Sequence, residues 1–522
     1  MLDQHRPDLE IPMTADLTSS TAVEQLDVLI VGAGVSGIGA AYYLQQSHPG
    51  KSYAIVEARE AIGGTWDLFR YPGIRSDSDL HTFGYAFKPW EGEKAIADGP
   101  SIRAYIEQTA SENGIDRHIR FGRRVLKAEW SSSAARWTVE LADVASGETT
   151  TVSTRWILGA TGYYRYDEGF TPAFPGLDRF GGQLIHPQHW PEDLDYAGKR
   201  VVVIGSGATA VTLVPAMAEQ AGHVTMLQRS PTYILPLPSE DKLANWLRGR
   251  LGTRRAYALA RWKNILRQIA LYRASQRFPK QVRKVIRSVN ERQLRGSGHD
   301  VDVHFNPAYE PWDQRLCAVP DGDFYRALRN GSASVVTDRI ETFTERGVRL
   351  ASGRELEADI VVTATGLNLL AIGGIEIVVD GREVALNDTI AYKSLMLSGV
   401  PNFAFAVGYT NSSWTLKVDL VWEYVCRLMA HQDATGTDTA VATPADPAMA
   451  TRPLLDFKAG YVLRSLDAFP RQGEQAPWRV VMSYLADVRQ LRRSPVEDGT
   501  MRFTRGAVAP AAAEPVEAAA SA

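Results

Sequence analysis

One pattern constrains the fold of this chain more than any other: a buried strand, a glycine-rich turn and a helix, present twice. In the first copy, the apolar run at 27–31 leads into the turn Gly32–Gly37, spaced as G-x-G-x-x-G. Helix-like sequence covers 38–46, and a second strand-like run at 53–56 ends at Glu57. Strand, helix and parallel strand in this order form a βαβ unit, which requires an α/β arrangement.

The chemistry of this first turn indicates a bound nucleotide. Glycine allows the tight turn and lets the backbone approach a pyrophosphate, whose charge is stabilised at the N-terminus of the helix. Glu57 lies twenty residues after Gly37, where a carboxylate accepts hydrogen bonds from a ribose. The alternative is a turn without a ligand, which the flanking strand and helix disfavour. The pattern therefore predicts a dinucleotide site.

A second unit of the same kind follows. An apolar run at 200–204 precedes the turn Gly205–Ala210, a G-x-G-x-x-A variant, and another strand-like run lies at 224–228. That run ends in Arg229 and Ser230 rather than in an acid. A cation at this place suits the 2′-phosphate of NADP, which a carboxylate would repel. A solvated surface arginine is the alternative, and NADPH is favoured over NADH.

Two such units predict an α/β fold with two Rossmann-like dinucleotide-binding domains. A length of 522 residues fits two or three domains. Further strand-like runs lie at 156–158, 360–363 and 402–407. The last two follow the second unit. The simplest layout therefore builds the first domain from residues 25–165 and 335–500, and inserts the second domain, residues 180–335, between them.

The segment 240–295 differs from the rest of the chain in charge. It holds 16 Lys and Arg against three acidic residues, whereas the whole chain has a formal net charge of −3. Apolar residues at helical spacing, such as Trp246 and Trp262, predict basic amphipathic helices inserted in the second domain. These helices either form a cap over a substrate pocket, which we favour, or contact an anionic membrane surface. No recognised nucleic-acid-binding module accompanies the charge, so nucleic acid is not expected as a partner.

Composition indicates where the chain works. Two cysteines, Cys317 and Cys426, are too few for a disulfide framework, which favours a reducing, cytoplasmic setting. No apolar run reaches about eighteen residues, the length of a membrane-spanning helix. Residues 1–24 lack the pattern of a secretion signal. Both ends, 1–24 and 505–522, are predicted to be disordered.

The most specific pattern lies between the two units, in the segment Phe180–Pro191. Its fixed positions, which include His186 and Trp190, match F-x-G-x-x-x-H-x-x-x-W-P and resemble the signature of Baeyer–Villiger monooxygenases. Five fixed positions make a chance match rare. The related flavin-containing N- and S-oxygenases carry a similar motif but usually lack its Trp-Pro ending. Without the motif, His186 would be interpreted as an ordinary polar residue at a domain junction.

This resemblance spans roughly residues 25–500 and is closest to the ethionamide-activating subgroup of the family. The other segments that carry it are GGTWDLFRYPGIRSDSD at 63–79, HFNPAYEPWDQRLC at 304–317 and TATGLN at 363–368. The resemblance implies FAD in the first domain and NADPH in the second. It further implies that O₂ and a ketone or thioether are the reactants.

The resemblance also implies which residues hold the cofactors. The positions expected to contact FAD are Gly32, Gly34, Ser36, Gly37, Glu57, Thr65, Trp66, Asp67, Leu68, Asp77 and the backbone of Val125. The positions expected to contact NADPH are Arg75, Ser76, Asp77, Gly205, Ser206, Gly207, Ala208, Thr209, Ala210, Val211, Arg229 and Ser230. Gly64 and Trp190 are further cofactor-binding candidates. Many relatives carry a lysine where this chain has Gln314, so the preference for NADPH is expected to be weaker.

Arg315 is the expected catalytic residue, together with Asp77 and His186. Ketone oxygenation in this family passes through anionic oxygen species, which a permanently charged guanidinium stabilises without a proton transfer. Asp77 resembles the family's carboxylate that orients the arginine, and a desolvated arginine needs such a counter-ion. A structural salt bridge is the alternative role for Arg315. No metal is expected, because flavin and O₂ carry the reaction.

Two other enzyme classes compete with this interpretation. A pyridine-nucleotide disulfide reductase would share both nucleotide folds but needs a redox-active C-x-x-C, which the chain lacks. A flavin-containing heteroatom oxygenase stays open as an alternative, because the same flavin chemistry oxidises sulfides. The residues do not decide between ketone and heteroatom substrates.

Overall fold

The first apolar run lies at the centre of a large sheet, in strand β1 (Glu24–Val31). β1 pairs in parallel with β2 (Tyr53–Val56) on one side and with β6 (Thr149–Gly159) on the other. Val28 and Ile30 belong to the core on one face of the sheet, and Leu29 belongs to the core on the other face. A strand buried on both faces explains the continuous apolar sequence.

The computed structural model describes residues 23–313, 316–455 and 460–506. Residues 1–22 and 507–522, which make up nearly all of the two predicted tails, lie outside the described residues, and Glu24 already belongs to β1. The remaining strands of the eleven-stranded first sheet are β3 (Ile119–Arg120), β4 (Arg123–Ser131), β5 (Arg136–Asp143), β19 (Glu376–Val379), β20 (Arg382–Glu383), β21 (Ala391–Tyr392), β22 (Met396–Leu397) and β23 (Phe403–Phe405).

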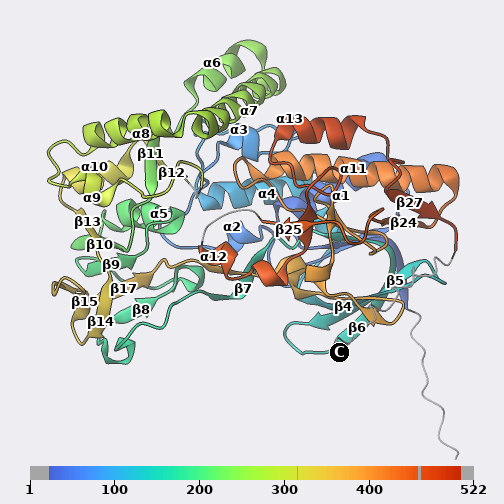
Figure 1. Cartoon of the computed structure of the whole chain (residues 1–522), viewed down its shortest axis with the longest axis horizontal. Coiled ribbons are helices and arrows are strands. Elements are labelled where there is room, and N and C mark those ends of the chain that lie inside the picture. Colours follow the sequence, from blue (N-terminus) through green and yellow to red (C-terminus); the bar gives the residue numbers. More distant parts are fainter. Residues whose placement is uncertain (1–22, 314–315, 456–459, 507–522) are drawn as a thin grey trace, which may run out of the picture.

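Helices α1 (Val35–Ser47) and α11 (Trp414–Thr435) pack together against the first sheet (Figure 1). Trp422 on α11 donates a hydrogen bond from its indole Nε1 to the carbonyl oxygen of Ser36 on α1, at 2.9 Å. The late helix therefore belongs to the first unit, as the strand β23 does through its pairing with β6. The other helices near this sheet are α2 (Thr65–Leu68), α3 (Leu80–Phe83) and α4 (Gly99–Glu112).

The second sheet has five parallel strands in the order β13-β10-β9-β17-β8. Their bounds are β8 (Gln183–Ile185), β9 (Arg200–Ile204), β10 (His223–Gln228), β13 (Ala333–Thr337) and β17 (Ile360–Thr363). Helix α5 (Ala208–Met217) follows the second glycine turn, and α10 (Asp323–Arg329) packs against it. The predicted second βαβ unit is thus present.

The predicted boundary at residue 335 is wrong, because β17 belongs to the second sheet. Ile360 is in register with Val201 of β9 and with Gln183 of β8. The run 360–363 is apolar and buried on both sides, a pattern that fits the middle of either sheet. Its membership is decided by tertiary pairing, and the chain returns to the first unit only after β17.

Two short strands connect the units, and they lie side by side. β7 (Tyr164–Gly169) leaves the first unit and β18 (Leu367–Leu369) returns to it, and the two pair antiparallel. Just beyond this pair, the Leu370 amide donates to the Tyr163 carbonyl oxygen at 3.0 Å. The remaining short elements are β11 (Tyr233–Leu237), β12 (Leu316–Pro320), β14 (Ile340–Thr344), β15 (Gly347–Leu350), β16 (Glu355–Glu357), β24 (Thr439–Ala442), β25 (Thr451–Pro453), β26 (Arg471–Gly473), β27 (Met501–Thr504), α9 (Val301–His304), α12 (Gly460–Leu463) and α13 (Tyr484–Asp487).

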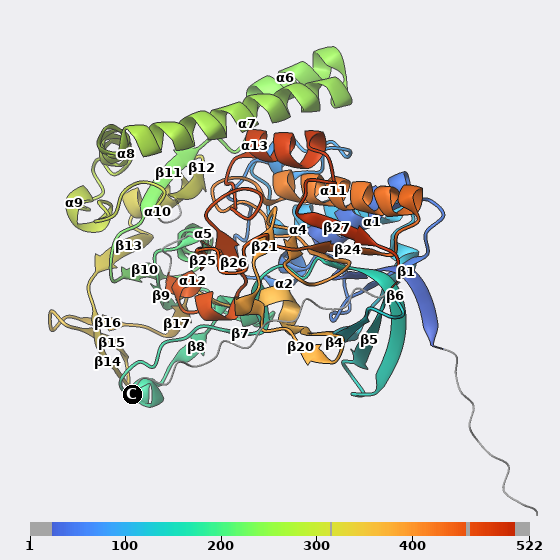
Figure 2. The same ribbon diagram turned by 45° about the vertical axis from the view of Figure 1, so that its right-hand side comes forward.

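The basic segment forms three helices, α6 (Lys242–Leu251), α7 (Thr253–Arg277) and α8 (Pro279–Gln293). They form a layer along the upper edge of the molecule, and α7 reaches from the second unit over α3 of the first (Figures 1 and 2). Ala256, Tyr257 and Ile265 on the inner side of α7 are buried, whereas Trp262 is exposed. The predicted helices are thus present, but their apolar residues do not gather on one buried face, because Trp246 and Leu266 are also exposed. Within the described residues, no helix has the length and apolar character needed to cross a membrane.

Candidate functional site

The first glycine turn has no room for a side chain at Gly32 and Gly37. Gly32 has φ +106°, and a Cβ built there would lie 2.7 Å from the Ala160 carbonyl oxygen. A Cβ at Gly37 would overlap the Gly32 carbonyl oxygen. The turn can therefore lie close to both the neighbouring strand and a ligand, and it leads directly into the N-terminus of α1.

Glu57 stands at the end of β2 and braces this turn. One carboxylate oxygen, Oε2, accepts from the Ala33 amide at 2.7 Å, and Oε1 accepts from the Arg59 amide at 2.9 Å. Burial raises the pKa of Glu57, and these two backbone donors oppose the rise. The carboxylate lines the cavity described next, at the place where the sequence pattern predicts a ribose.

A cavity of about 390 Å³ runs from the first glycine turn to the second unit. It brings together thirteen of the predicted cofactor-binding residues: Gly32, Gly34, Ser36, Glu57, Gly64, Thr65, Trp66, Arg75, Ser76, Asp77, Val125, Ala208 and Thr209. These residues come from segments up to about 180 positions apart in the chain. The cavity extends from the N-terminus of α1 to the N-terminus of α5, two positions that suit the phosphates of nucleotide cofactors.

The second glycine turn repeats the first in outline. Gly205 has φ +135°, and a Cβ there would overlap the Ala364 carbonyl oxygen. Ser206 donates from its hydroxyl to the Ser230 carbonyl oxygen at 3.2 Å, so the turn lies against the end of β10. Arg229 at that strand end is exposed. An exposed guanidinium beside a glycine turn is available to a phosphate on the adjacent ribose.

Several predicted cofactor-binding residues do not line this cavity: Gly37, Asp67, Leu68, Trp190, Gly205, Ser206, Gly207, Ala210, Val211, Arg229 and Ser230. For Asp67, its ion pairs explain why it does not line the cavity. Its buried carboxylate forms ion pairs with Arg59 at 2.6 Å, Arg103 at 3.0 Å and Arg70 at 3.3 Å. Its position behind the wall fits a residue that holds α2 in place, and its predicted contact with FAD stays a prediction.

His186 lies at the junction of the units and lines neither this cavity nor the larger chamber described below. Its Nδ1 accepts from the Gln188 amide at 3.2 Å, so the proton of the neutral ring is on Nε2, which donates to the Gly366 carbonyl oxygen at 3.2 Å. Burial lowers the pKa of this imidazole. The ring packs on Gly169 of β7, where a Cβ would overlap it. These contacts suit a residue that positions the connecting strands, and its catalytic role stays a prediction.

Next to the cofactor cavity is a larger chamber of about 1020 Å³ beneath α7. The two share four lining residues, Asp77, Ser78, Ala318 and Ser412, which we call the junction. The predicted Asp77 is therefore placed where a substrate in the chamber would meet a cofactor in the cavity. Arg315 and Gln314 lie outside the described residues. Trp312 and Leu316, on either side of them, both line the chamber.

Arg75, expected at NADPH, lines the cofactor cavity and forms an ion pair with Asp323 of α10. This pair connects a first-unit loop to the second unit across the cavity. A dinucleotide phosphate would compete with the Asp323 carboxylate for the same guanidinium. The pairing makes Arg75 a residue whose partner is expected to change with the nucleotide.

Sequence reasoning found Trp66 but missed two other aromatic residues of the cavity wall, Trp414 and Tyr166. Trp414 at the start of α11 donates from Nε1 to the Ser36 hydroxyl at 3.0 Å, and Tyr166 of β7 lies 3.4 Å from the Thr65 hydroxyl. Both aromatic residues line the cavity. The only local signal was the pair Ser412-Ser413 before an apolar helical run, which is a helix-start pattern. No spacing rule connects Trp414 to a residue 378 positions earlier.

Two nucleotide-binding units that share one cavity, with a second chamber joining it, define a two-cofactor oxidoreductase. A model of the flavin-binding monooxygenase-like family matches residues 96–253, and a model of the NAD(P)-binding Rossmann-like domain matches residues 30–90. The chain is 55% identical over 483 residues to the FAD-containing monooxygenase EthA of Mycobacterium tuberculosis, covering 92% of this chain and 98% of that protein.

Two solved structures are similar over most of the chain. Oxidized steroid monooxygenase bound to NADP matches with a TM-score of 0.71 and 26% identity, covering 92% of this chain and 100% of that one. OTEMO in complex with FAD and NADP matches with a TM-score of 0.64 and 26% identity, covering 80% of this chain and 87% of that one.

The chain belongs to the flavin-binding monooxygenase-like family and is a flavin monooxygenase. The predicted α/β fold with two Rossmann-like domains is confirmed. The resemblance to Baeyer–Villiger and ethionamide-activating monooxygenases is confirmed at the level of this family.

Proposed function

We propose that this enzyme is of the Baeyer–Villiger type, uses FAD and NADPH, and converts ketones into esters or lactones while also oxidising thioethers. The observation that carries the proposal is the junction: a substrate in the chamber would meet the flavin beside Asp77 and Ser412. The Trp-Pro ending of Phe180–Pro191 favours this type over a heteroatom oxygenase. The flavin-containing S- and N-oxygenases are the second candidate.

The described residues fit both cofactors. The first glycine turn and the N-terminus of α1 would hold the pyrophosphate of FAD, and Glu57 would accept from its ribose. The second turn and Arg229 would hold NADPH, whose 2′-phosphate the exposed guanidinium suits. When bound, the flavin supplies electron transfer to O₂. Asp77, at the junction, would orient the Arg315 guanidinium toward the developing negative charge.

The overall reaction balances without any further reactant. One oxygen atom of O₂ enters between the ketone carbonyl carbon and a neighbouring carbon, and the other leaves as water. NADPH gives two electrons as hydride, and solvent gives one proton. For a thioether, the inserted oxygen atom instead ends on sulfur.

The chamber indicates the kind of substrate. Ile96, Leu235, Leu237, Leu271 and Leu316 supply an apolar wall, and a volume of about 1020 Å³ is at the upper end for small-molecule sites. Apolar ketones or thioethers with a long chain or several rings would fill it. Short ketones would leave much of the wall uncovered, so we expect weaker binding of them.

The test is product mass spectrometry with NADPH and ¹⁸O₂ on a mixture of linear ketones, cyclic ketones and thioethers, with NADPH omitted as the control. Labelled esters or lactones are the expected products, formed preferentially from the larger ketones. Labelled sulfoxides alone would overturn the Baeyer–Villiger assignment and favour the heteroatom oxygenase.

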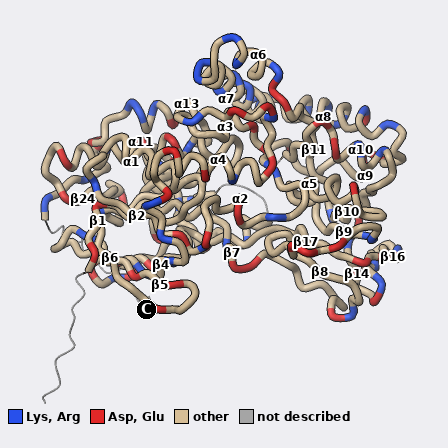
Figure 3. Tube along the Cα trace, turned by 180° about the vertical axis from the view of Figure 1, so that it is seen from behind, with Lys and Arg blue, Asp and Glu red and all other residues tan. Residues whose placement is uncertain are grey.

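We also propose, from the exposed apolar and basic side chains of α6 and α7, that the outer face of these helices contacts an anionic membrane surface on the cytoplasmic side. Trp246 is 55% exposed, Leu259 51% and Leu266 54%. No acidic residue occurs from Lys242 to Asn290, and Figure 3 shows Lys and Arg gathered along α6 at the edge of the molecule. Apolar side chains among cations suit anionic lipid. A second copy of the chain would bring cations against cations.

Sedimentation with vesicles of phosphatidylglycerol and phosphatidylcholine tests this contact. The wild type is expected to sediment at low salt and to be released at high salt. The double variant Trp246→Ser, Trp262→Ser should bind less, whereas Leu184→Ser, a control at a residue 41% exposed on β8, should not change binding. Equal sedimentation of all three proteins, or none by the wild type, would overturn the membrane contact.

A further inference from the structure

Helix α7 turns a polar stripe toward the first unit. Arg261, Asn264 and Gln268 are three and four residues apart, so they lie on one side of the helix. Asn264 is fully buried and Arg261 nearly so. Desolvating three polar side chains is unfavourable unless each finds partners. Asn264 also donates to Asp241 before α6 at 3.3 Å, and the partners described below lie in or next to α3, on α11 or in the loop that precedes α11, all in the first unit.

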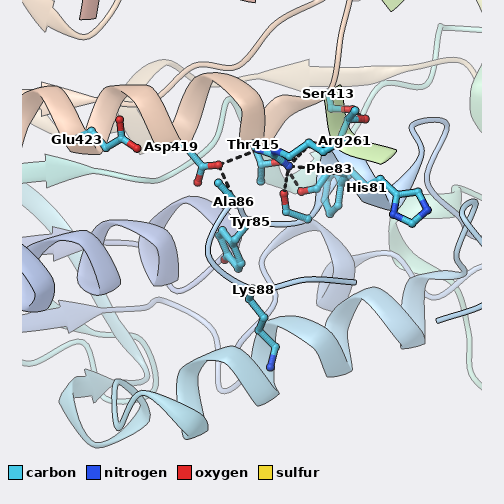
Figure 4. A network of polar contacts seen from close by, with 12 residues as sticks. His81, Phe83, Tyr85, Ala86, Lys88, Arg261, Ser413, Thr415, Asp419 and Glu423 are labelled. Atoms are coloured by element: carbon cyan, nitrogen blue, oxygen red, sulfur yellow. Dashed lines mark hydrogen bonds and ion pairs between the residues drawn. The ribbon is translucent and has the colours of Figure 1, made fainter. Parts of the chain in front are cut away.

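At one end of the stripe, Arg261 donates hydrogen bonds to the C-terminal end of α3 (Figure 4). Its Nη1 donates to the carbonyl oxygens of His81 at 3.0 Å, Thr82 at 3.3 Å and Gly84 at 2.6 Å. Its Nη2 donates to Oδ2 of Asp419 on α11 at 2.9 Å. The guanidinium thus satisfies carbonyl groups at the C-terminus of α3 that have no partner within the helix.

At the other end of the stripe, α7 contacts Asp79, the residue that precedes the same short helix. Asp79 caps α3: its Oδ1 accepts from the Thr82 amide at 3.1 Å and from Asn264 Nδ2 at 2.9 Å. Its Oδ2 accepts from the Thr82 hydroxyl at 3.0 Å and from Gln268 Nε2 at 3.0 Å. A buried carboxylate of this kind is stable only because four donors replace its water. Two of the four come from α7.

Gln268 also bonds to the loop before α11, a segment that Arg261 and Asn264 do not contact through a hydrogen bond between described residues. Its Oε1 accepts from the Ser412 hydroxyl at 2.6 Å, while Nε2 also donates to the Thr82 hydroxyl at 3.1 Å. One amide therefore joins α7, α3 and the loop before α11. Ser412 is a junction residue, and Asp79 is two residues from Asp77, another junction residue. Gln268 itself lines the chamber but not the cofactor cavity.

We propose that Gln268 is a positioning residue: by bonding Asp79 and Ser412 together, it sets the spacing of the junction at which substrate and flavin meet. The proposal rests on the proposed function and adds a residue to it. Because a neutral amide both donates and accepts, it can donate to the Asp79 carboxylate while it accepts from the Ser412 hydroxyl, which an ionised carboxylate at this position could not do. Because α7 belongs to the second unit, the same amide makes the junction depend on how that unit sits on the first.

The first experiment is Gln268→Leu, which keeps the size and removes the three hydrogen bonds. Amide hydrogen exchange in residues 77–83 and 410–413 should become about tenfold faster, as expected when hydrogen bonds that hold a segment are lost. Flavin content and the rate of flavin reduction by NADPH should stay close to wild type, because Gln268 does not line the cofactor cavity. Hydrogen peroxide released per NADPH should rise about tenfold with a ketone present, since small displacements cost much in rate.

Two further variants separate positioning from general damage. Gln276→Leu makes the same replacement at an exposed position of α7 and should behave as wild type. Ser412→Ala should reproduce part of the Gln268→Leu effect, and Ser412→Thr, which restores a hydroxyl, should recover it. The double variant Gln268→Leu, Ser412→Ala should show less than the sum of the two single effects, because both remove the same bond.

The outcomes are distinct. Unchanged hydrogen exchange in both segments of Gln268→Leu would overturn the proposal. It would also be overturned if flavin content and the thermal midpoint fell in proportion to the loss of product, because that result marks a structural role alone. If the wild type forms no oxygenated product from any ketone or thioether, the proposed function fails, and hydrogen exchange still decides whether Gln268 holds the junction segments. If products form with wild-type coupling in Gln268→Leu, only the positioning role fails.

Discussion

At the scale of single residues, the glycine turns show what local sequence can predict. A turn that places the Gly32 Cβ position 2.7 Å from a carbonyl oxygen accepts only glycine, so the need for glycine can be inferred from spacing alone. Glu57 was predictable for the same reason, since the βαβ unit fixes where its strand ends. Trp414 was not predictable, because its partner Ser36 is distant in sequence and no local pattern carries that contact.

Gly32→Ala should lose flavin. The positive φ and the overlap with Ala160 together destabilise the turn by roughly 1–3 kcal/mol, and the backbone moves from the place a pyrophosphate needs. Flavin absorbance per protein after purification should fall to a small fraction of the wild-type value. Gly50→Ala, where a Cβ would meet open space, is the control. A fully loaded Gly32→Ala protein would show that the turn does not hold the cofactor.

Arg315→Ala tests the residue that the sequence selects for catalysis. The variant should keep FAD and should oxidise NADPH, because neither step needs charge stabilisation at the ketone. Ester formation should fall by about a hundredfold or more, as for other losses of a group that stabilises transition-state charge, with hydrogen peroxide released instead. Product and peroxide yields per NADPH are the measurements. Ester formation at the wild-type rate would remove Arg315 from the mechanism.

At the scale of elements, periodicity predicted strands and helices but not which sheet a strand joins. The run 360–363 was correctly predicted as a strand, yet its four buried apolar residues suit either sheet equally. The signature segment was likewise found by its fixed positions, whereas the role of His186 as a contact of both connecting strands depends on Gly366 and Gly169, which only the fold brings to it. The sheet that a strand joins and the contacts of His186 both depend on tertiary structure, so the local sequence does not predict them.

Gly169→Ala should disturb the connecting strands. Its Cβ would overlap the His186 ring, which then loses its bond to the Gly366 carbonyl oxygen. Flavin content should stay near wild type, because neither residue lines the cofactor cavity, while kcat should fall by about tenfold through misplaced units. Steady-state kinetics and flavin absorbance together provide the check, with Gly50→Ala, where a Cβ would meet open space, as control. Unchanged kcat would show that the strand pair tolerates the shift.

At the scale of the whole molecule, several half-buried histidines make stability depend on pH. Burial lowers the pKa of His186, His299 and His304 below the ordinary value of 6.5. Above that pH both folded and unfolded chains are uncharged at these groups. As the pH falls through it, the unfolded chain binds protons that the folded chain does not, so the stability present above pH 6.5 is lost.

The midpoint of urea unfolding should therefore decrease steadily from pH 7.5 to pH 5.5, with pH values chosen to bracket the ordinary histidine pKa of about 6.5. His299→Gln should flatten part of this dependence, because it removes one of the groups. His118→Gln, at a histidine of the short helical turn Asp116–His118 that precedes β3, serves as the matched substitution. A midpoint that rises or stays level as the pH falls would contradict the assignment.

The side-by-side strands β7 and β18 have a consequence for how the chain could be rebuilt. Tyr163 and Leu370 are hydrogen-bonded neighbours, although the entire second unit and its helical layer lie between them in sequence. The second unit is thus an insertion whose first and last residues lie next to each other. Cutting the chain at these two places and joining the flanking ends would leave the strand order of the first sheet unchanged. Exchanging this insertion with that of a relative would transfer the nicotinamide side and α7 as one piece, and the exchanged helix would bring its own version of the Gln268 contact to an unchanged flavin side.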